Sequence, residues 1–135
     1  MKKTALLLFG LLVFYSCLNS DNDSPNYTFE YVPIDSAITP ASFTLGQIDT
    51  ITVKYSLPNS CFTFDQIYYQ PKDSTRTIAI IAAVKLDDIC TEAIVQEEKK
   101  IAVKATQEED YVFKFFKGKD SDGENIFEEV IVPVN

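Results

Sequence analysis

The chain has 135 residues, a formal net charge of −8 at neutral pH and no histidine. The acidic balance argues against the basic patches that neutralise phosphates, so nucleic acid is not an expected partner. The lack of histidine excludes Ser–His–Asp and Cys–His catalytic arrangements and removes the commonest metal ligand. We therefore predict a protein that is not an enzyme and that needs no metal ion or other cofactor.

Residues 1–16 have the pattern of a cleaved signal peptide. Lys2 and Lys3 form a short basic region, and the apolar run at 5–15 is much shorter than the roughly 20 residues that span a bilayer. A cysteine directly after such a segment resembles the lipobox of bacterial lipoproteins. This resemblance implies that Cys17 receives lipid and begins the mature chain. Ordinary cleavage, which would leave a free thiol, is the alternative.

Residues 17–27 are expected to form the lipidated cysteine and a flexible acidic tether. The stretch from Asn19 to Asn26 is polar and has too few apolar side chains to order itself. Asp21 and Asp23 resemble the surface-export signal of Bacteroidota lipoproteins. We therefore expect an outer-membrane lipoprotein at the cell surface, with a periplasm-facing position as the alternative.

The segment 28–135 is predicted to be one β-sandwich domain. A first strand is expected within 27–38, interrupted by Pro33. Residues 50–57 alternate between polar and apolar side chains, which is the period of a half-buried strand. The apolar side chains on one face of this strand are Ile51, Val53, Tyr55 and Leu57.

Two further strands are predicted at 61–70 and 75–86. The first is rich in aromatic residues, and the second is nearly continuous in apolar and β-branched residues, as expected where both faces of a sheet are covered. Tyr68 and Tyr69 are adjacent, so they should point to opposite faces of their strand. At most one of the two is therefore expected to be exposed, and the other should join the core.

The segment 87–105 is harder to assign. It contains good helix formers, but its apolar positions do not keep a period of about 3.6 residues. We predict one strand near 92–96 and another near 101–105. A helical turn around 88–93 is the alternative.

The last third of the chain predicts a β-hairpin. Residues 111–117 and 126–134 are the two strands, and Gly123 supplies the positive φ of the connection. Asp120–Glu124 also has a faint likeness to a calcium-binding loop, but a plain turn is favoured. The side chains expected to face the core are Tyr111, Phe113 and Phe115 in the first strand and Val130, Val132 and Val134 in the second.

Three cysteines would leave one unpaired thiol in an oxidising compartment. If Cys17 carries lipid, Cys61 and Cys90 remain, and we predict a disulfide between them. Such a bridge would stabilise the fold by about 3–4 kcal/mol in the chain-entropy estimate. A metal site is the alternative, although two cysteines without histidine make a poor zinc site.

About seven short strands separated by turn signals predict an all-β, two-sheet antiparallel sandwich. The C-terminal part resembles immunoglobulin-like (Ig-like) domains, because an acidic turn at 108–110 precedes Tyr111 and a glycine-containing hairpin follows. This resemblance implies a tyrosine-corner hydrogen bond from Tyr111. With its lipobox, acidic tether and the pair Cys61 and Cys90, the whole chain is similar to the small Ig-like lipoproteins of Bacteroidota, many of which have no assigned activity.

Two acidic clusters are the only candidates for carboxylate chemistry. They are Asp87 with Asp88, and Glu108, Glu109 and Asp110. Both clusters fall where turns are expected, so we interpret them as solvated loop charge rather than as a catalytic pair. Three short motifs resemble the O-glycosylation signal of Bacteroidota exported proteins. The candidate acceptors in these motifs are Ser36, Thr50 and Ser74.

We therefore expect a lipid-anchored accessory or interaction module at the cell envelope. Its partner would be an envelope protein or a glycan, contacted through the loops at 58–61, 70–75 and 117–124. A small-ligand or glycan-binding lipoprotein is one alternative, and it would need a pocket lined by the aromatic segment 62–69. A protease-inhibitor-like module with a rigid, protruding loop is another.

Overall fold

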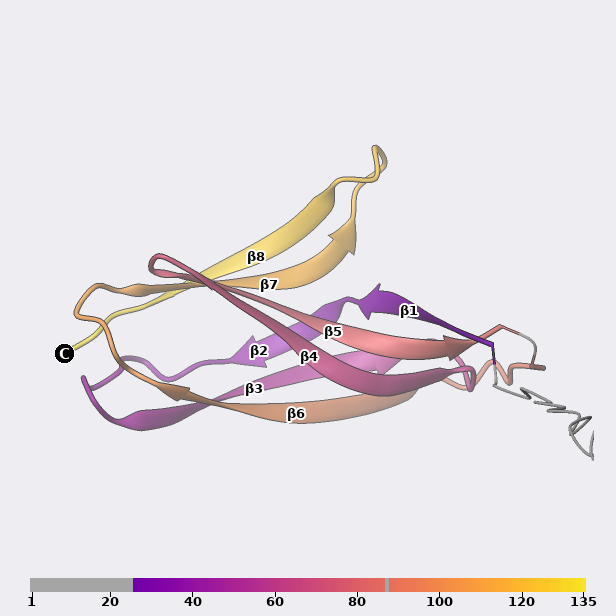
Figure 1. The fold of residues 1–135 in the computed structure, drawn as a ribbon, viewed down its shortest axis with the longest axis horizontal. Helices are drawn as coiled ribbons and strands as arrows, with labels where there is room; N and C mark the ends of the chain where they lie inside the picture. Colours follow the sequence, from indigo (N-terminus) through magenta and orange to yellow (C-terminus); the bar gives the residue numbers. More distant parts are fainter. Residues whose placement is uncertain (1–25, 87) are drawn as a thin grey trace, which may run out of the picture.

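The computed structural model describes residues 26–86 and 88–135, and within them the chain forms two β-sheets and no helix (Figure 1). None of these residues therefore lies in a helix that is long and apolar enough to cross a membrane. The prediction of an all-β sandwich is confirmed. The signal peptide at 1–16, Cys17 and most of the tether lie outside the described residues.

The described part of the chain has eight strands, where the sequence predicted about seven. They are β1 (Tyr27–Val32), β2 (Ile34–Ile38), β3 (Ile48–Leu57), β4 (Phe62–Lys72), β5 (Thr75–Lys85), β6 (Val95–Lys104), β7 (Tyr111–Lys119) and β8 (Asn125–Val132). The expected interruption at Pro33 divides the first predicted strand into β1 and β2. β1 begins at Tyr27, one residue before the predicted start of the domain.

The five-stranded sheet is built around β5. β4 pairs antiparallel along one edge of β5. The other edge is shared, because β1 pairs antiparallel with residues 80–85 and β7 pairs parallel with residues 75–78. β8 then pairs antiparallel with β7. The parallel pair departs from a fully antiparallel sandwich: β6, in the other sheet, reverses the chain between β5 and β7, so these two strands run in the same direction.

The three-stranded sheet has the order β2–β3–β6 and forms the second layer, drawn below the β7–β8 hairpin in Figure 1. β1 and β2 are consecutive in the chain but belong to different sheets. Pro33 lies at the point where the chain changes sheets, where its missing N–H removes no ladder hydrogen bond. The same short segment thus contributes to both layers.

The two strands predicted within 87–105 are wrong, because a single ten-residue strand, β6, runs from Val95 to Lys104. The described residues 88–93 form no helical turn either. The charged run in the middle of β6 stays in the sheet because β6 is an edge strand, where charged side chains remain solvated. Glu98 also lies opposite Lys54 of β3, and their charged groups are 3.8 Å apart.

The core lies between the two sheets, and the predicted alternation is confirmed in β3 and β7. The buried side chains that face the core are Ile51, Val53, Tyr55 and Leu57 in β3 and Tyr111, Phe113 and Phe115 in β7, while Phe116 is buried on the opposite face of β7. Phe43, which no predicted strand included, is also fully buried, with its ring centroid 5.1 Å from that of Tyr111. Backbone hydrogen bonds to Pro133 and Asn135 hold Phe43 beside the C-terminal segment.

The β7–β8 hairpin has the predicted glycine turn and one irregularity that was not predicted. Gly123 has a φ of 81°, and the Asp120 carboxylate accepts hydrogen bonds from the backbone N–H groups of Asp122 and Glu124. Near the end of β7, Gly118 has a φ of 114° at a register shift in the ladder. This bulge re-aims the end of the hairpin.

Candidate functional site

An aromatic series crosses the outer face of the five-stranded sheet. Its four rings come from four different strands and follow one another at centroid distances of 5.8, 5.8 and 6.0 Å. In order, they belong to Tyr68 of β4, Tyr31 of β1, Phe116 of β7 and Phe127 of β8. These spacings are those of favourable aromatic pairs, so neighbouring rings support one another.

The rings surround a depression of about 270 Å³, which we call the aromatic groove. Its lining consists of Tyr31, Tyr68, Gln70, Thr77, Ala79, Phe116, Asn125 and Phe127. The groove exists because β5, the central strand, presents only small side chains here, Thr77 and Ala79. The ring of Tyr68 on one side of β5 and the ring of Tyr31 on the other meet across this strand, with their centroids 5.8 Å apart, and Ala79 is buried.

The groove combines apolar walls with hydrogen-bonding groups. The Tyr68 hydroxyl donates to the Gln70 side-chain oxygen at 2.5 Å, and this bond leaves the Gln70 amide hydrogens directed elsewhere. Asn125 supplies a second amide at the β8 side. No charged side chain is among the groove's lining residues. On β7 and β8, Lys114 and Glu129 form an ion pair at 3.2 Å, and Lys117 and Glu128, which follow Phe116 and Phe127, form another at 3.6 Å.

A second depression adjoins the aromatic groove. It is about 430 Å³ in volume and is lined by Glu30, Tyr31, Pro33, Phe116, Gly118 and Lys119. Tyr31 and Phe116 line both depressions, so this ring pair forms the divide between them. The second depression lies where β1 and β7, which share one edge of β5, separate from each other.

The sequence pointed to only part of this site. Tyr68 and Tyr69 do face opposite sides of β4: Tyr68 joins the aromatic series and Tyr69 packs against the core. Phe62 and Phe64 also pack against the core, so the segment 62–69 does not line one pocket. The sequence also contained a signal for Phe116 that the predictions did not use. Alternation in β7 puts Phe116 on the face opposite the side chains that face the core.

In the three-stranded sheet, a polar contact joins β3 to the edge strand β6. The buried Tyr55 hydroxyl donates to the Glu97 carboxylate at 2.5 Å. Burial, and then this hydrogen bond, raise the pKa of Tyr55 well above its ordinary value. The Lys99 ammonium lies 4.1 Å from the centre of the Phe64 ring, which bridges β6 to β4. These contacts stabilise the edge between the two sheets.

The predicted tyrosine corner is present. The Tyr111 hydroxyl oxygen accepts a hydrogen bond from the Thr106 backbone N–H at 3.0 Å, and the Arg76 guanidinium lies 4.9 Å from the centre of the Tyr111 ring. Burial is the largest influence and would raise the pKa of Tyr111. The Thr106 bond and the Arg76 charge together outweigh burial and lower this pKa. Burial raises the pKa of nearby Tyr69, although Arg76 acts against it.

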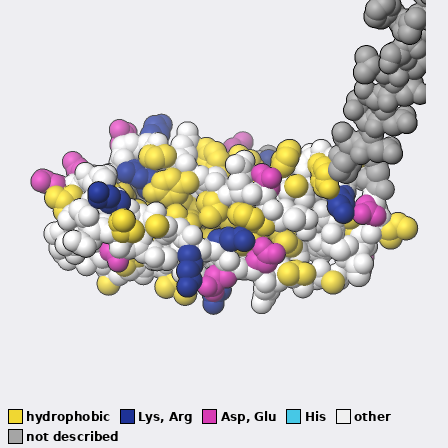
Figure 2. Space-filling model, turned by 60° about the horizontal axis from the view of Figure 1, so that its bottom comes forward, with side chains coloured by type: hydrophobic (Ala, Val, Ile, Leu, Met, Phe, Trp, Pro, Cys, Tyr) yellow, Lys and Arg dark blue, Asp and Glu magenta, His cyan; other side chains and the backbone are white. Residues whose placement is uncertain are grey.

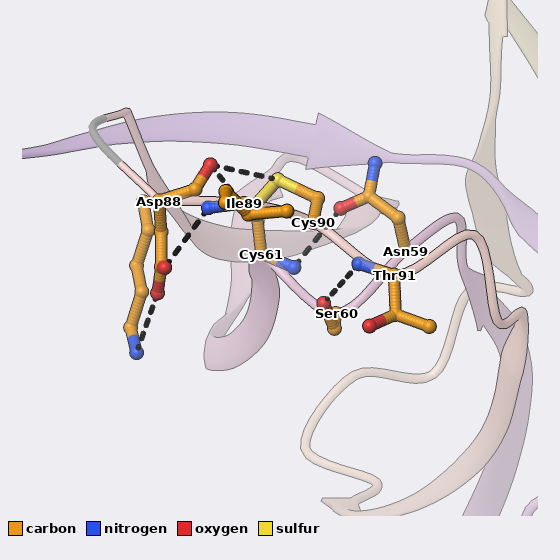
Figure 3. The surroundings of a disulfide bond; sticks show 8 residues. Asn59, Ser60, Cys61, Asp88, Ile89, Cys90 and Thr91 are labelled. Atoms are coloured by element: carbon orange, nitrogen blue, oxygen red, sulfur yellow. Dashed lines mark hydrogen bonds and ion pairs between the residues drawn. A yellow bond between two sulfur atoms is a disulfide. The ribbon is translucent and has the colours of Figure 1, made fainter.

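Cys61 and Cys90 form the predicted disulfide, with their Cα atoms 5.2 Å apart (Figure 3). Two hydrogen bonds join the same two segments beside the disulfide. The Thr91 N–H donates to the Ser60 hydroxyl at 2.7 Å, and the Ser60 N–H donates to the Thr91 carbonyl at 3.0 Å. Ile89 projects beside the bridge and is 96% exposed. The loop before β6 is thereby fixed to the β3–β4 connection.

The other predicted site residues are scattered. Ser36 and Thr50 are exposed on strands, whereas Ser74 is half-buried in the turn between β4 and β5. Asp88 pairs with Lys85 at 3.7 Å, and Asp87 lies outside the described residues. Among the residues that the structure describes, no cluster of three or more cysteine, aspartate or glutamate side chains could hold a metal ion.

Two of the three loops proposed as contact surfaces are shorter than predicted. Residues 70–72 belong to β4 and residues 117–119 belong to β7, which leaves only tight turns at these places. The segment 58–61 is a loop, but the disulfide at Cys61 ties it down. On the face shown in Figure 2, hydrophobic side chains gather along the middle of the molecule with charged side chains around them.

Residues 51–128 match the family model of the ORF11 beta-sandwich domain. The match contains the disulfide and every residue of the aromatic groove except Tyr31. Neither the curated proteins nor the solved structures provide a significant match. More than half of the chain is covered by this one model, and the two-sheet architecture agrees with its description. The chain therefore belongs to the ORF11 beta-sandwich domain family.

Proposed function

We propose that this protein is a lipid-anchored lipoprotein of the cell envelope whose β-sandwich is a non-catalytic interaction module. In this proposal Cys17 carries the lipid, after removal of residues 1–16, and the acidic tether leads to the folded domain. The protein would lie at the outer membrane, facing the cell surface or the periplasm. This is the organisation of the small Ig-like lipoproteins of Bacteroidota, which the sequence resembles.

The Cys61–Cys90 disulfide is the observation that carries the proposal. Disulfides persist in oxidising compartments such as the periplasm and the cell surface, and they are rare in the cytosol. A chain with this disulfide is therefore expected to be exported, which agrees with the leader-like residues 1–16. Cys17 is then the one cysteine left without a partner, and it directly follows that leader.

The aromatic groove supports the role as an interaction module. Tyr31, at its centre, is 53% exposed, although aromatic side chains gain most from burial. The groove lies on a sheet that the disulfide and the core hold in one arrangement, so it offers a preformed surface. A partner that covers Tyr31 and Phe127 would bury apolar area that now faces solvent. The proposed partner is an envelope protein or a glycan.

The proposal is tested by the intact mass of the protein purified from its native membrane, with and without reductant. The expected chain begins at Cys17, carries acyl mass and gains a pair of hydrogens on reduction. A Cys17→Ser variant is the matched control: it should lose the acyl mass and membrane association but keep the disulfide. A wild-type chain without acyl mass would contradict the lipid anchor.

The same measurement tests O-glycosylation, which we propose for Ser36, Thr50 and Ser74. The first two are exposed, so an enzyme can reach them in the folded protein. Hexose-like mass that disappears from a Ser36→Ala or a Thr50→Ala variant would identify the acceptor. Ser74 is half-buried, so its modification would have to precede folding or follow a local opening of the turn.

A further inference from the structure

We propose that the aromatic groove on the outer face of the five-stranded sheet binds a neutral oligosaccharide. The inference rests on the proposed role as an interaction module and names the class of ligand. It combines three features of the groove: exposed aromatic rings, amide side chains at its rim, and a lining without charge.

The arrangement of the rings suits a sugar. Tyr31, Phe116 and Phe127 approach the groove from three different strands, and their neighbour contacts fix their positions. A pyranose ring has an apolar face of C–H groups, which pack against the electron-rich face of an aromatic ring. Tyr31 and Phe127 are 53% and 36% exposed, so their rings offer area for such a contact, whereas Phe116 and Ala79 are buried.

The rim supplies the polar half of recognition. Ligand sites are mostly apolar with a few placed polar groups, and planar amides can both donate to and accept from sugar hydroxyls. Gln70 and Asn125 provide these amides on opposite sides of the groove. Because the Tyr68 hydroxyl donates to the Gln70 oxygen, the Gln70 nitrogen is left as the donor toward a ligand.

The charge of the groove favours a neutral ligand. A uronic or sialic acid would bring a carboxylate into a lining that offers no lysine or arginine. On the same face, Lys114 is already paired with Glu129. The adjoining depression contains one charge of each sign, Glu30 and Lys119, and so adds no net charge.

The two joined depressions favour an oligosaccharide over a single sugar. A chain that crosses the divide between Tyr31 and Phe116 would occupy both of them. An extended peptide fits less well. The floor strand β5 is paired along both edges over Thr75–Ile78, so it has no free backbone edge there on which a peptide could add a strand.

The test is calorimetric titration of the full chain with cellohexaose, maltohexaose and laminarihexaose, and with hexagalacturonate as the acidic probe. A polyoxyethylene detergent is needed, because the headgroup of an alkyl glycoside would compete for the groove. We expect saturable binding of at least one neutral hexasaccharide and weaker binding of the acidic one. Failure of all three neutral probes to bind, or preferential binding of the acidic probe, would overturn the proposal.

Variants locate the site. Tyr31→Ala and Gln70→Ala should each weaken binding, the first by about tenfold if one stacking contact of about 1.4 kcal/mol is lost. Tyr27→Ala is the matched control, since Tyr27 is a partly exposed aromatic residue on the same face of β1 but does not line the groove. Thermal unfolding of each variant confirms that the fold is kept. Equal affinity in wild type and Tyr31→Ala would place the sugar elsewhere and overturn the assignment.

The result does not depend on the lipid anchor. A Cys17→Ser chain should bind the same hexasaccharide with unchanged affinity while losing its membrane association. Sugar binding by a chain that proves to lack lipid would retain the groove assignment and refute the anchor. A lipidated chain that binds none of the neutral probes would refute the groove assignment and leave the anchor intact.

Discussion

The hydroxyl oxygen of Tyr111 accepts a hydrogen bond from the backbone N–H of Thr106, five residues earlier, at 3.0 Å. The bond fixes the chain where it leaves β6 in one sheet and enters β7 in the other. Tyr111 is fully buried, and its ring contacts those of Phe43 and Phe113. The corner thus links the crossover between the sheets to the aromatic part of the core.

Replacing Tyr111 with Phe should lower the free energy of unfolding by about 1 kcal/mol, the usual net contribution of one such hydrogen bond. The aromatic packing would remain, so a larger loss is not expected. Urea denaturation of both proteins measures the difference. Tyr27→Phe serves as the control, because Tyr27 is partly exposed and should tolerate the loss of its hydroxyl. Equal losses in the two variants would show that the corner hydrogen bond adds nothing.

Tyr55 should make stability fall at alkaline pH. Burial and the hydrogen bond to Glu97 raise its pKa in the folded protein. The unfolded tyrosine loses its proton near pH 10, whereas the folded one keeps it. The contribution is therefore complete below about pH 10 and is lost progressively as the pH rises further. In Tyr55→Phe, unfolding free energies at about pH 8 and about pH 11 should differ less than in wild type.

The comparison needs a control for the other tyrosines, which also ionise in this range. Tyr27→Phe keeps Tyr55 and should retain the full alkaline loss of stability. The stability of Tyr55→Phe could instead depend on pH as strongly as that of wild type. Tyr55 would then have the same pKa in the folded and unfolded states, and burial and Glu97 would not raise it.

Removing the disulfide should destabilise the protein substantially. Cys61 and Cys90 are 29 positions apart in the chain, and closing a loop of this size stabilises a fold by about 3–4 kcal/mol in the chain-entropy estimate. The Cys61→Ser/Cys90→Ser double variant should show this loss in denaturant, and wild type should approach it on addition of reductant. A reductant effect that persists in the double variant would have to come from another source.

Gly118 should resist substitution because of its backbone. Its φ of 114° is strongly unfavourable for a residue with a side chain. The Cβ of an alanine would lie 3.6 Å from Pro33 Cγ, which is an ordinary contact, so collision is not the cause. Gly118→Ala is expected to cost about 1–3 kcal/mol of unfolding free energy from strain. Lys119→Ala, one residue on, is the control and should be nearly neutral in the same denaturation experiment.

Side-chain alternation predicted much of the fold, where one face of a strand meets the core. In β3 and β7 the apolar positions followed a period of two, and the structure buries them as expected. The alternation failed for β6, whose charged run Glu97–Lys100 looked like an interruption. It is tolerated because this edge strand keeps its charges in water or pairs them, as Glu98 does with Lys54.

Phe43 and the aromatic groove show what one-dimensional patterns leave out. Phe43 is held in the core by backbone bonds to the C-terminal segment, some 90 residues away, and no local pattern encodes that pairing. The groove needs side chains from four strands on one face. Alternation predicts which face of β7 carries Phe116. The strand order of the sheet is needed to place Phe116 beside Tyr31 of β1.

The way β1 joins the sheet determines how the domain would carry a mechanical load. β1 begins at the end of the long molecule opposite the C-terminus, and its six residues pair with β5 in antiparallel register. If the N-terminal segment is attached to a membrane, a pull on a bound partner acts along these strands. The β1–β5 hydrogen bonds would then be loaded together, in shear, and would not open one at a time. Hydrogen bonds loaded in shear resist force far better than those of a hairpin pulled apart from its open end. This pairing therefore suits a domain that is tethered through its first strand.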